Sequence, residues 1–487
     1  MRVAVATLIG IDIGTGAVKA ILIDLEGNVL ETFVRPYPTA RPKPGFAEQD
    51  PRDWLEGVLA ALASLGRAHD LSGLLGIGLC SQVNTHVFVD QNAHPLLPAF
   101  VWQDVRCAED AAALDARISP QEKIAWFGGP MPIDASHALA RMSYVARTCP
   151  ELYARTRHVL LPKDYCALKL TGCAATDPIS SVGLVDAELR YVDDLIARVA
   201  NAREKLPPLQ DFTSCVGTVA SGLPCAGAPV FVGIMDAWAG MFGIGVIRNR
   251  DTMYLSGTSE VLGIVSAEHV ATPGVIVFPS YHGIRLHAAP TQSGGASIDW
   301  LCAVLGQNAE EVSRLAAATP ASSSVPLFLP HLQGERAPLW DTKSRGVFAR
   351  MDAATGRGEF CRAVMEGVAF SARLALEAAE RSAGFAADSL NIGGGGARSE
   401  VWCQIRADAL GKSLRRATVL DAGTLGAAVL AGVGSGAMPS LQAAVDRLVS
   451  FGRTFEPADE IRRYYDDRFA KYQELYVDLK RFNGSYS

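Results

Sequence analysis

The chain has 487 residues, of which 49% are hydrophobic and 20% are charged, and this balance excludes general disorder. This length exceeds what one hydrophobic core usually supports, so two or more domains are expected. The net charge of −6 disfavours a nucleic-acid partner. The absence of a long apolar run disfavours a membrane partner. Ten scattered cysteines without a C-x-x-C pair indicate a cytoplasmic protein.

The beginning of the chain is predicted to mix strands and helices. Apolar runs between turn residues predict strands over 8–13, 18–24, 29–34, 74–79 and 87–90. The turn Gly14-Thr15-Gly16 joins the first two strands into a β-hairpin. Helical spacing of apolar residues predicts a helix over 51–65, with Asp50 as its N-cap. This alternation is typical of an α/β domain.

The same layout returns near the middle of the chain. Residues 251–265 again read as strand, Gly257-Thr258 turn and strand. The two Gly-Thr turns lie about half the chain length apart, which indicates two similarly folded halves. We therefore expect an N-terminal domain over 1–245 and a C-terminal domain over 246–487.

The first turn has the residue types that a phosphate site needs. Glycines in a tight turn let a phosphate approach the backbone N–H groups of Gly14, Thr15 and Gly16. Asp12 is able to hold Mg²⁺ directly or through water, and Lys19 is able to neutralise phosphate charge. The alternative is an ordinary hairpin turn with a solvated lysine.

A run of glycines follows a second apolar segment. Gly393, Gly394, Gly395, Gly396 and Ala397 stand between that segment, which ends at Ile392, and a predicted helix over 401–410. Backbone without side chains there allows close packing against a flat or anionic ligand. The run lacks the order and the following acidic residue of a dinucleotide fingerprint. A flexible loop is the alternative.

Asp236 lies in a glycine-rich stretch near the expected junction of the halves. A carboxylate there is able to take the proton from a hydroxyl that attacks the γ-phosphate of ATP. The same residue is also a natural helix N-cap.

Further segments carry distinctive patterns, namely Glu48-Gln49-Asp50-Pro51, Trp102-Gln103-Asp104-Val105-Arg106, Lys163-Asp164-Tyr165, Gly334-Glu335-Arg336 and Gly423-Thr424-Leu425-Gly426. Together with the turns above, their types and order resemble the FGGY family of carbohydrate kinases, and Gly334-Glu335-Arg336 resembles its pentulose kinases.

The resemblance implies two ribonuclease-H-like (actin-like ATPase) domains around a cleft that closes on ATP and a sugar. It implies a role in ATP and phosphate binding for Asp12, Gly14, Thr15, Gly16, Lys19, Gly257, Thr258, Gly394, Gly395, Gly396 and Ala397. It implies Mg²⁺ at Asp12, directly or through water, and Asp236 as the general base. A homodimer is compatible with it.

The acceptor is less well specified. The resemblance points to Gln82, Val83, Asn84, Trp102, Asp104 and Asp236 as its binding residues. Val83-Asn84 departs from the Met-His of xylulokinase-like members and from the Arg-Glu of glycerol-kinase-like members, and Trp102 is also a candidate for plain core packing. A ketopentose such as D-xylulose is favoured, with ribulose, erythritol, glycerol and gluconate open. The rivals are a catalytically silent sugar sensor and a filament-forming actin-like ATPase.

Overall fold

The computed structural model describes residues 5–127 and 132–484. The chain forms two compact units, the first running to Gly243 and including Gly423–Leu448, the second formed by Ile244–Ala422 and the residues from Val449. Each unit is built around its own mixed sheet, so the expected α/β class is confirmed. The break lies two residues before the expected boundary. Residues 423–448, which we expected in the second half, pack with the first unit instead.

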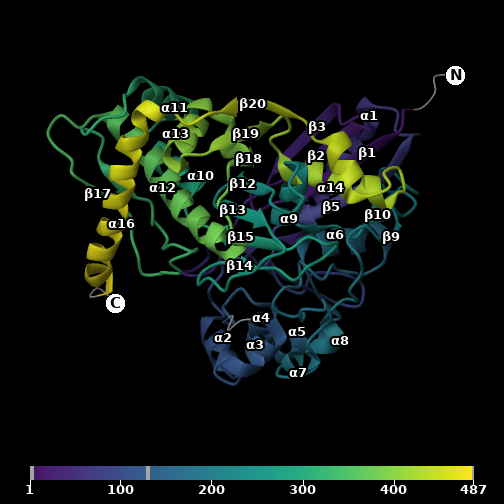
Figure 1. The fold of residues 1–487 in the computed structure, drawn as a ribbon. Coiled ribbons are helices and arrows are strands. Elements are labelled where there is room, and N and C mark those ends of the chain that lie inside the picture. The colour runs from purple at the N-terminus through teal and green to yellow at the C-terminus, as the bar shows by residue number, and fades with distance from the viewer. Residues whose placement is uncertain (1–4, 128–131, 485–487) are drawn as a thin grey trace. The chain divides into compact units, whose positions relative to one another are not determined.

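The sheet of the first unit has the order β3-β2-β1-β5-β10-β9, with β11 beside β5 (Figure 1). Its strands are β1 (Thr7–Ile13), β2 (Ala17–Asp24), β3 (Val29–Pro36), β5 (Leu74–Ser81), β9 (Cys215–Thr218), β10 (Pro229–Phe231) and β11 (Ile234–Met235). The first three form an antiparallel meander, and β5 is parallel to β1. The predicted hairpin and the predicted third strand are therefore confirmed.

Helices and two short two-stranded sheets make up the rest of the first unit. The helices of the first unit are α1 (Pro51–Ala68), α2 (Ala108–Asp115), α3 (Pro120–Phe127), α4 (Ala138–Thr148), α5 (Pro150–Arg155), α6 (Pro162–Thr171), α7 (Asp193–Ile196), α8 (Ala202–Lys205), α9 (Asp236–Gly243), α14 (Ala422–Gly434) and α15 (Leu441–Leu448). The short sheets pair β4 (Glu48–Gln49) with β7 (Ala99–Phe100) and β6 (Val87–Val89) with β8 (His158–Leu160). Asp50 caps α1 by accepting a hydrogen bond from the backbone of Arg52, as predicted.

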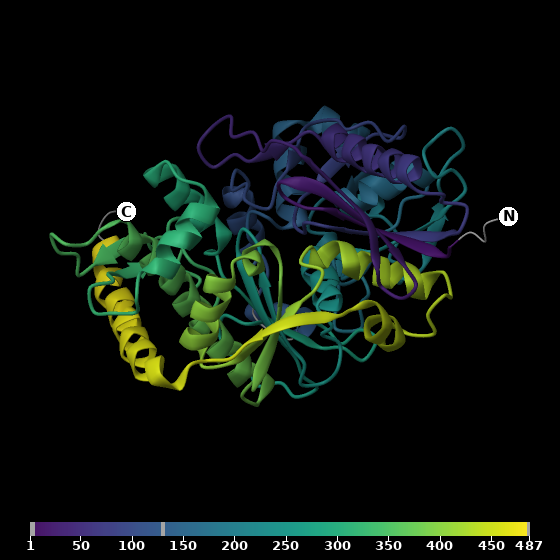
Figure 2. The same cartoon turned by 90° about the horizontal axis from the view of Figure 1, so that it is seen from above.

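Glycines explain why α14 belongs to the first unit. Gly10 on β1 and Gly78 on β5 face each other in register. A Cβ on Gly10 would lie 1.9 Å from the carbonyl oxygen of Thr424, and one on Gly78 would lie 1.8 Å from that of Ala427. Their neighbours on the opposite face of the sheet, such as Ile11, pack with α1 in the core. The sheet thus accepts α14, yellow beside the purple strands in Figures 1 and 2, at backbone contact.

The sheet of the second unit has the order β14-β15-β13-β12-β18-β19-β20. Its strands are β12 (Thr252–Ser256), β13 (Glu260–Val265), β14 (Ile276–Val277), β15 (Leu286–Pro290), β18 (Ser389–Gly393), β19 (Ser413–Ala417) and β20 (Phe451–Phe455), and β16 (Leu327–Leu329) pairs with β17 (Val347–Ala349) apart from it. Strand β12 is antiparallel to β13 and parallel to β18. The predicted second hairpin is therefore confirmed.

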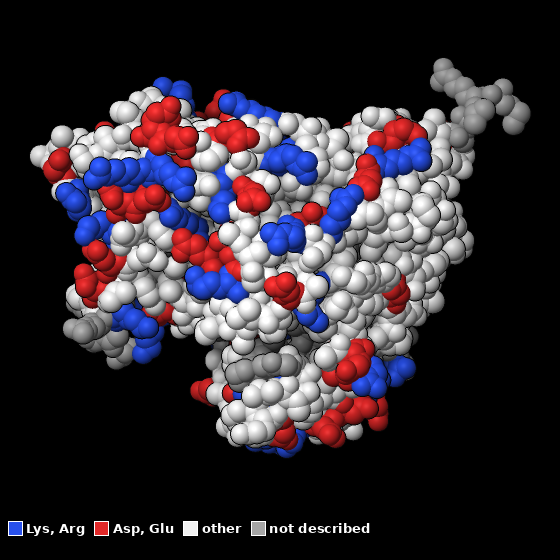
Figure 3. Space-filling model, viewed as in Figure 1, with Lys and Arg blue, Asp and Glu red and all other residues white. Residues whose placement is uncertain are grey.

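Helix α12 (Arg357–Ala383) forms the centre of the second core, where it packs against β13 and β15. The other helices of this unit are α10 (Gly295–Leu305), α11 (Ala309–Ala318), α13 (Glu400–Leu410) and α16 (Arg462–Gly484), with short 3₁₀ turns η1 (Gly395–Arg398) and η2 (Asp459–Ile461). Figure 3 shows Lys and Arg interspersed with Asp and Glu on the face that it draws.

The two sheets repeat one plan. In each, a three-stranded antiparallel meander (β1-β2-β3, β12-β13-β15) continues through parallel strands (β5 and β10, β18 and β19). This is the ribonuclease-H-like arrangement that the family resemblance implies, and each Gly-Thr turn lies in the first hairpin of its sheet. Among the described helices, none is long and apolar enough to span a bilayer.

Candidate functional site

The turn between β1 and β2 has its carbonyl groups held by its own chain. The hydroxyl of Tyr37 bonds to Gly14 O, Gln49 Nε2 donates to Thr15 O at 2.7 Å, and the backbone N–H of Tyr37 donates to Gly16 O at 3.2 Å. The N–H groups of Thr15 and Gly16 make no hydrogen bond to the described residues. Carbonyls tied back and N–H groups left available are what an anion-binding turn requires.

The glycines of this turn leave space that the chain itself does not use. A Cβ on Gly16 would find no atom within 4 Å beyond its chain neighbours, and the nearest atom to one on Gly14 would lie at 3.5 Å. Neither glycine has a positive φ. Packing and backbone conformation therefore do not require glycine at these two positions.

Two carboxylates stand at the same edge of the first sheet. Asp12 lies near the end of β1 opposite Cys80 of β5, and Asp236 directly follows β11, which is paired in parallel with β5. Burial and the nearby carboxylates of Asp12 and Asp236 raise the pKa of the Cys80 thiol. A Cβ on Gly423, in the first turn of α14, would meet Asp12 Oδ2 at 2.9 Å. The carboxyl ends of parallel strands are where α/β proteins place ligands.

Asp236 is half-buried at the start of α9, and its Oδ1 accepts a hydrogen bond from the backbone of Ala237 at 2.8 Å. The helix-terminus interpretation of this residue is therefore correct as geometry. It does not exclude a catalytic role, because the same contact orients the carboxylate.

Lys19 lies on β2 directly opposite Asp12. Side chains of directly opposed residues share a face of the sheet, so the ammonium group and the carboxylate lie on one side of it. Lys19 is half-buried.

The metal ligands at this edge suit a Mg²⁺ ion that is shared with phosphate and water, not a metal ion that protein side chains hold alone. In the described parts of the chain, no group of three His, Cys, Asp or Glu residues has the arrangement of a metal cage. Mg²⁺ usually keeps several waters and takes one or two carboxylates together with substrate phosphates. Asp12, beside the phosphate turn, supplies a carboxylate of this kind.

The turn between β12 and β13 repeats the design of the first. Its carbonyl groups accept hydrogen bonds from the start of α10, Gly295 N donating to Gly257 O at 2.9 Å and Ala296 N to Thr258 O at 3.0 Å. The N–H groups of Thr258 and Ser259 make no backbone hydrogen bond among the described residues. A Cβ on Gly257 would meet its nearest atom only at 3.5 Å.

Arg336 braces this second turn, and its role was not apparent from the sequence. Its guanidinium donates to Ser259 Oγ at 3.0 Å and to Thr291 O at 2.6 Å. The neighbouring Glu335 is 3% exposed and accepts hydrogen bonds from the hydroxyls of Ser293 and Ser371. The Gly-Glu-Arg segment therefore supports the turn.

The glycine run after β18 divides into packed and open positions. A Cβ on Gly394, which has φ +94°, would lie 2.3 Å from Ser256 O, and one on Gly396 would lie 2.1 Å from Ser256 Oγ. A Cβ on Gly395 would find nothing within 4 Å, and Ala397 is buried in the second core. The flexible-loop alternative is wrong here, because the run is a 3₁₀ turn packed against β12. Gly395 is the position that chain packing leaves unexplained.

A buried ion pair lies under these two loops. Arg406 donates to Glu260 Oε1 at 2.5 Å, to Ser256 Oγ at 2.6 Å and to Gly396 O at 3.1 Å. Both charged side chains are 0% exposed. Arg406 thus joins the glycine run to the second turn, a role that local sequence does not signal.

The predicted acceptor segment follows β5. Asn84 is half-buried with φ +53°, and its carbonyl oxygen accepts a hydrogen bond from Arg141. Its side-chain amide makes no hydrogen bond to the described residues. Arg141, which is fully buried, also donates to the carbonyls of Phe100 and Val101, and burial lowers its pKa to about 10. One arginine therefore holds both loops of the predicted acceptor region. His86, also buried, contacts Arg141 through its Nδ1 at 2.8 Å.

Trp102 and Gln82 belong to one hydrogen-bond network. Trp102 is half-buried, and its Nε1 donates to Thr15 Oγ1 at 3.0 Å, so it is not a plain core residue. Gln82 is 1% exposed, and its amide is held by Gln49 and Thr85. Val83, beside them, is half-buried.

Asp104 needs a correction as a candidate acceptor ligand. Its side chain is 0% exposed, and it accepts hydrogen bonds from Ala47 N at 2.7 Å and Arg106 Nη2 at 2.6 Å. Arg106 also pairs with Glu48 at 2.7 Å. Because its own chain occupies the carboxylate, Asp104 fixes the acceptor loops and does not offer itself to a sugar.

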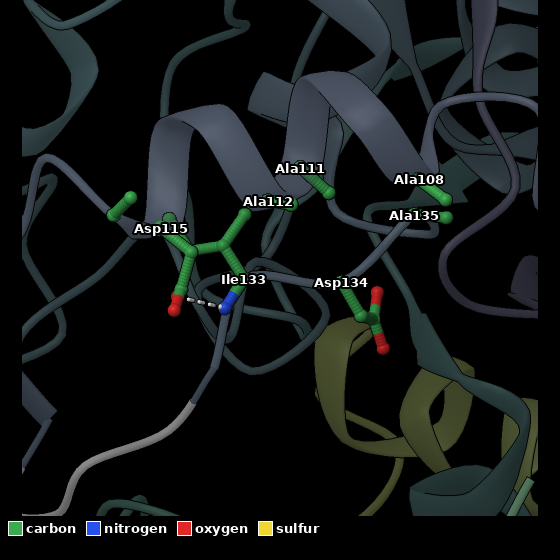
Figure 4. Close-up of a pocket in the computed structure, with 8 residues that line it drawn as sticks. Ala108, Ala111, Ala112, Asp115, Ile133, Asp134 and Ala135 are labelled. Carbon is green, nitrogen blue, oxygen red and sulfur yellow. Dashed lines mark hydrogen bonds between the residues drawn. The ribbon is translucent and has the colours of Figure 1, made fainter.

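A shallow pocket lies elsewhere in the first unit, between α2 and the segment 133–135 (Figure 4). Alanine side chains line it, and the carboxylate of Asp115 accepts a hydrogen bond from Ile133 N at 2.7 Å. None of the predicted site residues lines it.

Two family models match successive parts of the chain. The model of the FGGY family of carbohydrate kinases, N-terminal domain, matches residues 7–243, and that of the C-terminal domain matches residues 252–435. The chain belongs to the FGGY family of carbohydrate kinases. It is therefore a sugar kinase that uses ATP as phosphate donor, and the silent-sensor and filament alternatives are set aside.

Relatives of this kinase include proteins named xylulose kinase and glycerol kinase. Xylulose kinase of Escherichia coli K12 is 31% identical over 485 residues, which cover 97% of this chain and 99% of that protein. Glycerol kinase of Citrifermentans bemidjiense is 29% identical, with 94% and 95% covered. The solved structure of a xyloylose kinase from Brucella ovis is 29% identical, with 98% and 100% covered and a TM-score of 0.84.

Proposed function

We propose that this kinase phosphorylates a hydroxyl of a ketopentose such as D-xylulose, with Asp236 as general base. The observation that carries the proposal is the shared position of Asp12 and Asp236 at one sheet edge beside a turn with available N–H groups. Phosphoryl transfer depends on positioning, charge neutralisation and a base, and this edge supplies each of them.

The phosphates of ATP take the available N–H groups. Thr15 and Gly16 in the first turn, and Thr258 in the second, donate backbone N–H groups to phosphate oxygens, while Lys19 neutralises charge. Asp12 holds Mg²⁺ directly or through water, and the ion neutralises the charge of the transferring group. The run Gly394–Ala397 lines the adenosine site, and Gly395, which has no side chain, provides space for the adenosine.

Asp236 acts on the acceptor. Its carboxylate accepts the proton of the attacking hydroxyl as the bond to phosphorus forms. The hydrogen bond from Ala237 N to Oδ1 orients this carboxylate. Exclusion of water matters as well, because water competes with the sugar as acceptor.

A neutral sugar fits the predicted acceptor residues. Val83, Asn84 and Trp102 carry no positive charge, which disfavours an acid such as gluconate. The amide of Asn84 both donates and accepts, as recognition of a hydroxyl needs. The names of the xylulose kinase relatives support a ketopentose, whereas the glycerol kinase relative keeps glycerol as the second candidate.

The test is ADP release by the full chain, measured with Mg-ATP and a panel of acceptors. D-xylulose, D-ribulose, glycerol, erythritol and D-gluconate are compared at equal concentration, together with a blank without acceptor. The proposal predicts the highest kcat/KM for D-xylulose. If another member of the panel has a higher kcat/KM, it replaces D-xylulose as the assigned acceptor. If ADP is released at the same rate with and without every acceptor, the proposal is overturned.

A further inference from the structure

We infer that Gln49 is a positioning residue that couples the acceptor segment to the first phosphate turn. The inference rests on the proposed function, because it takes residues 82–85 and 102 as the acceptor side. Gln49 is 2% exposed on β4. It therefore touches neither substrate directly and acts through the groups that it holds.

The connection is a closed ring of five hydrogen bonds. Gln49 Nε2 donates to Thr15 O at 2.7 Å, and Trp102 Nε1 donates to Thr15 Oγ1 at 3.0 Å. Gln82 Nε2 donates to Gln49 Oε1 at 2.8 Å, and Thr85 Oγ1 donates to Gln82 Oε1 at 3.2 Å. The backbone N–H of Trp102 closes the ring on Thr85 Oγ1 at 3.1 Å. The turn is thus joined to the acceptor segment by two separate routes.

The orientation of the Gln49 amide is fixed by its partners. Thr15 O only accepts, so it must face the NH₂ group, and Trp54 Nε1, 3.0 Å from Oε1, only donates. The second N–H of Gln49 goes to Thr39 Oγ1 at 2.8 Å. Both donors and both acceptor positions of the amide are therefore used, and no other side chain of this size reproduces the pattern.

The ring has a consequence for binding. Gln49 holds Thr15 O, and because this carbonyl shares a planar peptide group with the N–H of Gly16, the contact fixes the direction of that N–H group. A sugar that contacts Trp102 restrains the other side of the ring. A buried polar network is costly when only part of its hydrogen bonds are made. The phosphate turn and the acceptor segment are therefore expected to become ordered together. Sugar and nucleotide should then bind with positive coupling, which by linkage is the same in both directions.

Gln49→Glu breaks the ring at one bond without changing the size of the side chain. A carboxylate still accepts from Trp54 and Gln82, but it cannot donate to Thr15 O. Thr39→Val is the matched control, since it removes the one partner of the same NH₂ group that lies outside the ring. Thr85→Val opens the ring on its far side without adding charge, in case the buried carboxylate of the first variant prevents folding.

The measurement is the Kd of a non-hydrolysable ATP analogue by calorimetry, on the full chain with Mg²⁺, with and without the acceptor of highest kcat/KM in the panel above. In the wild type, the acceptor should tighten analogue binding about fivefold or more. The ratio of the Kd without acceptor to the Kd with acceptor should fall close to one in Gln49→Glu and in Thr85→Val. The double variant should have no further effect on this ratio. Thr39→Val should keep the wild-type ratio.

An uncoupled wild type, or a Gln49→Glu variant with the wild-type ratio, would overturn the inference. So would loss of coupling in Thr39→Val, because the effect would then be general to the packing of Gln49. These outcomes differ from failure of the proposed function, which appears beforehand as absence of acceptor-dependent turnover in the wild type.

Discussion

The indole Nε1 of Trp102 donates a hydrogen bond to the side-chain hydroxyl of Thr15 at 3.0 Å. One of these residues stands in the proposed acceptor region and the other in the proposed phosphate turn. The proposed acceptor region and the first proposed phosphate turn are therefore joined within one unit of the chain. Substitutions there should separate the handling of sugar from the handling of ATP.

Asp236→Asn tests the base. The amide keeps the size of the carboxylate and its acceptor contact with Ala237 N, but it cannot take a proton. We expect kcat to fall by a factor on the order of 10³ with nearly unchanged ATP affinity. The readouts are steady-state ADP release and calorimetric binding of an ATP analogue. Asp134→Asn, where an exposed carboxylate bonds to Ser136 N, is the matched control, and equal activity of the two variants would refute the role of Asp236.

Gly16→Ala tests whether the open space of the first turn belongs to a ligand. The added methyl group meets no atom of the protein within 4 Å, so thermal stability should not change. The KM for ATP should rise by about tenfold, which corresponds to a loss of about 1.4 kcal/mol. Gly10→Ala is the opposite case, since its methyl group would lie 1.9 Å from Thr424 O and should destabilise the fold. An unchanged KM for ATP in Gly16→Ala would remove the turn from the nucleotide site.

Asn84 is best tested by glycine, because its φ of +53° penalises alanine independently of the amide. Asn84→Gly keeps the backbone conformation and the carbonyl contact with Arg141. The KM for the sugar should rise by about tenfold, as expected for loss of one hydrogen bond, while the KM for ATP stays the same. Equal changes in both KM values would mean that Asn84 acts through the loop and not on the sugar.

Arg406→Met should destabilise the second unit strongly. It leaves Glu260 buried without its ion-pair partner, which typically costs 3–5 kcal/mol, an effect measurable by denaturant unfolding. The double variant with Glu260→Gln should recover much of this loss. Arg314→Met is a matched control, because Arg314 pairs with Glu311 at 2.6 Å on the surface, and its loss should lower the free energy of unfolding far less than loss of the buried pair. Similar losses in both single variants would contradict the buried network.

The buried histidines predict acid sensitivity of the fold. Burial lowers the pKa of His287 to about 4 and holds the pKa of His86 well below its usual value. The unfolded chain binds these protons near pH 6.5 and the folded chain does not, so the free energy of unfolding falls as pH drops from 6.5 toward 4. Each group contributes a slope of about 1.4 kcal/mol per pH unit. Urea unfolding at several pH values measures it. His287→Gln should flatten the slope, and the exposed control His94→Gln should not.

Local features of the fold were predictable from sequence. The Gly14–Gly16 and Gly257–Thr258 turns each join strands that follow one another along the chain, so short-range pattern was sufficient. The place of residues 423–448 was not predictable in this way. The sheet that α14 covers depends on the small residues Gly10 and Gly78, which lie far away from it in sequence.

The same limit applies to the candidate site. The glycines and carboxylates near the phosphate turns carry a local signature. Gln49, Arg336 and Arg406 act through partners distant along the chain, so their contacts emerge only from the structure. Asp104 was misjudged for a related reason, because its neutralising partner Arg106 was visible in sequence but the burial of the pair was not.

The most direct measurement of the central claim follows the γ-phosphate itself. The full chain is incubated with Mg²⁺, ATP labelled at the γ-phosphate, and D-xylulose, and the labelled products are separated. We predict that the label appears in a sugar phosphate and that its formation requires D-xylulose. Label recovered only as inorganic phosphate, at a rate independent of the sugar, would contradict the proposal.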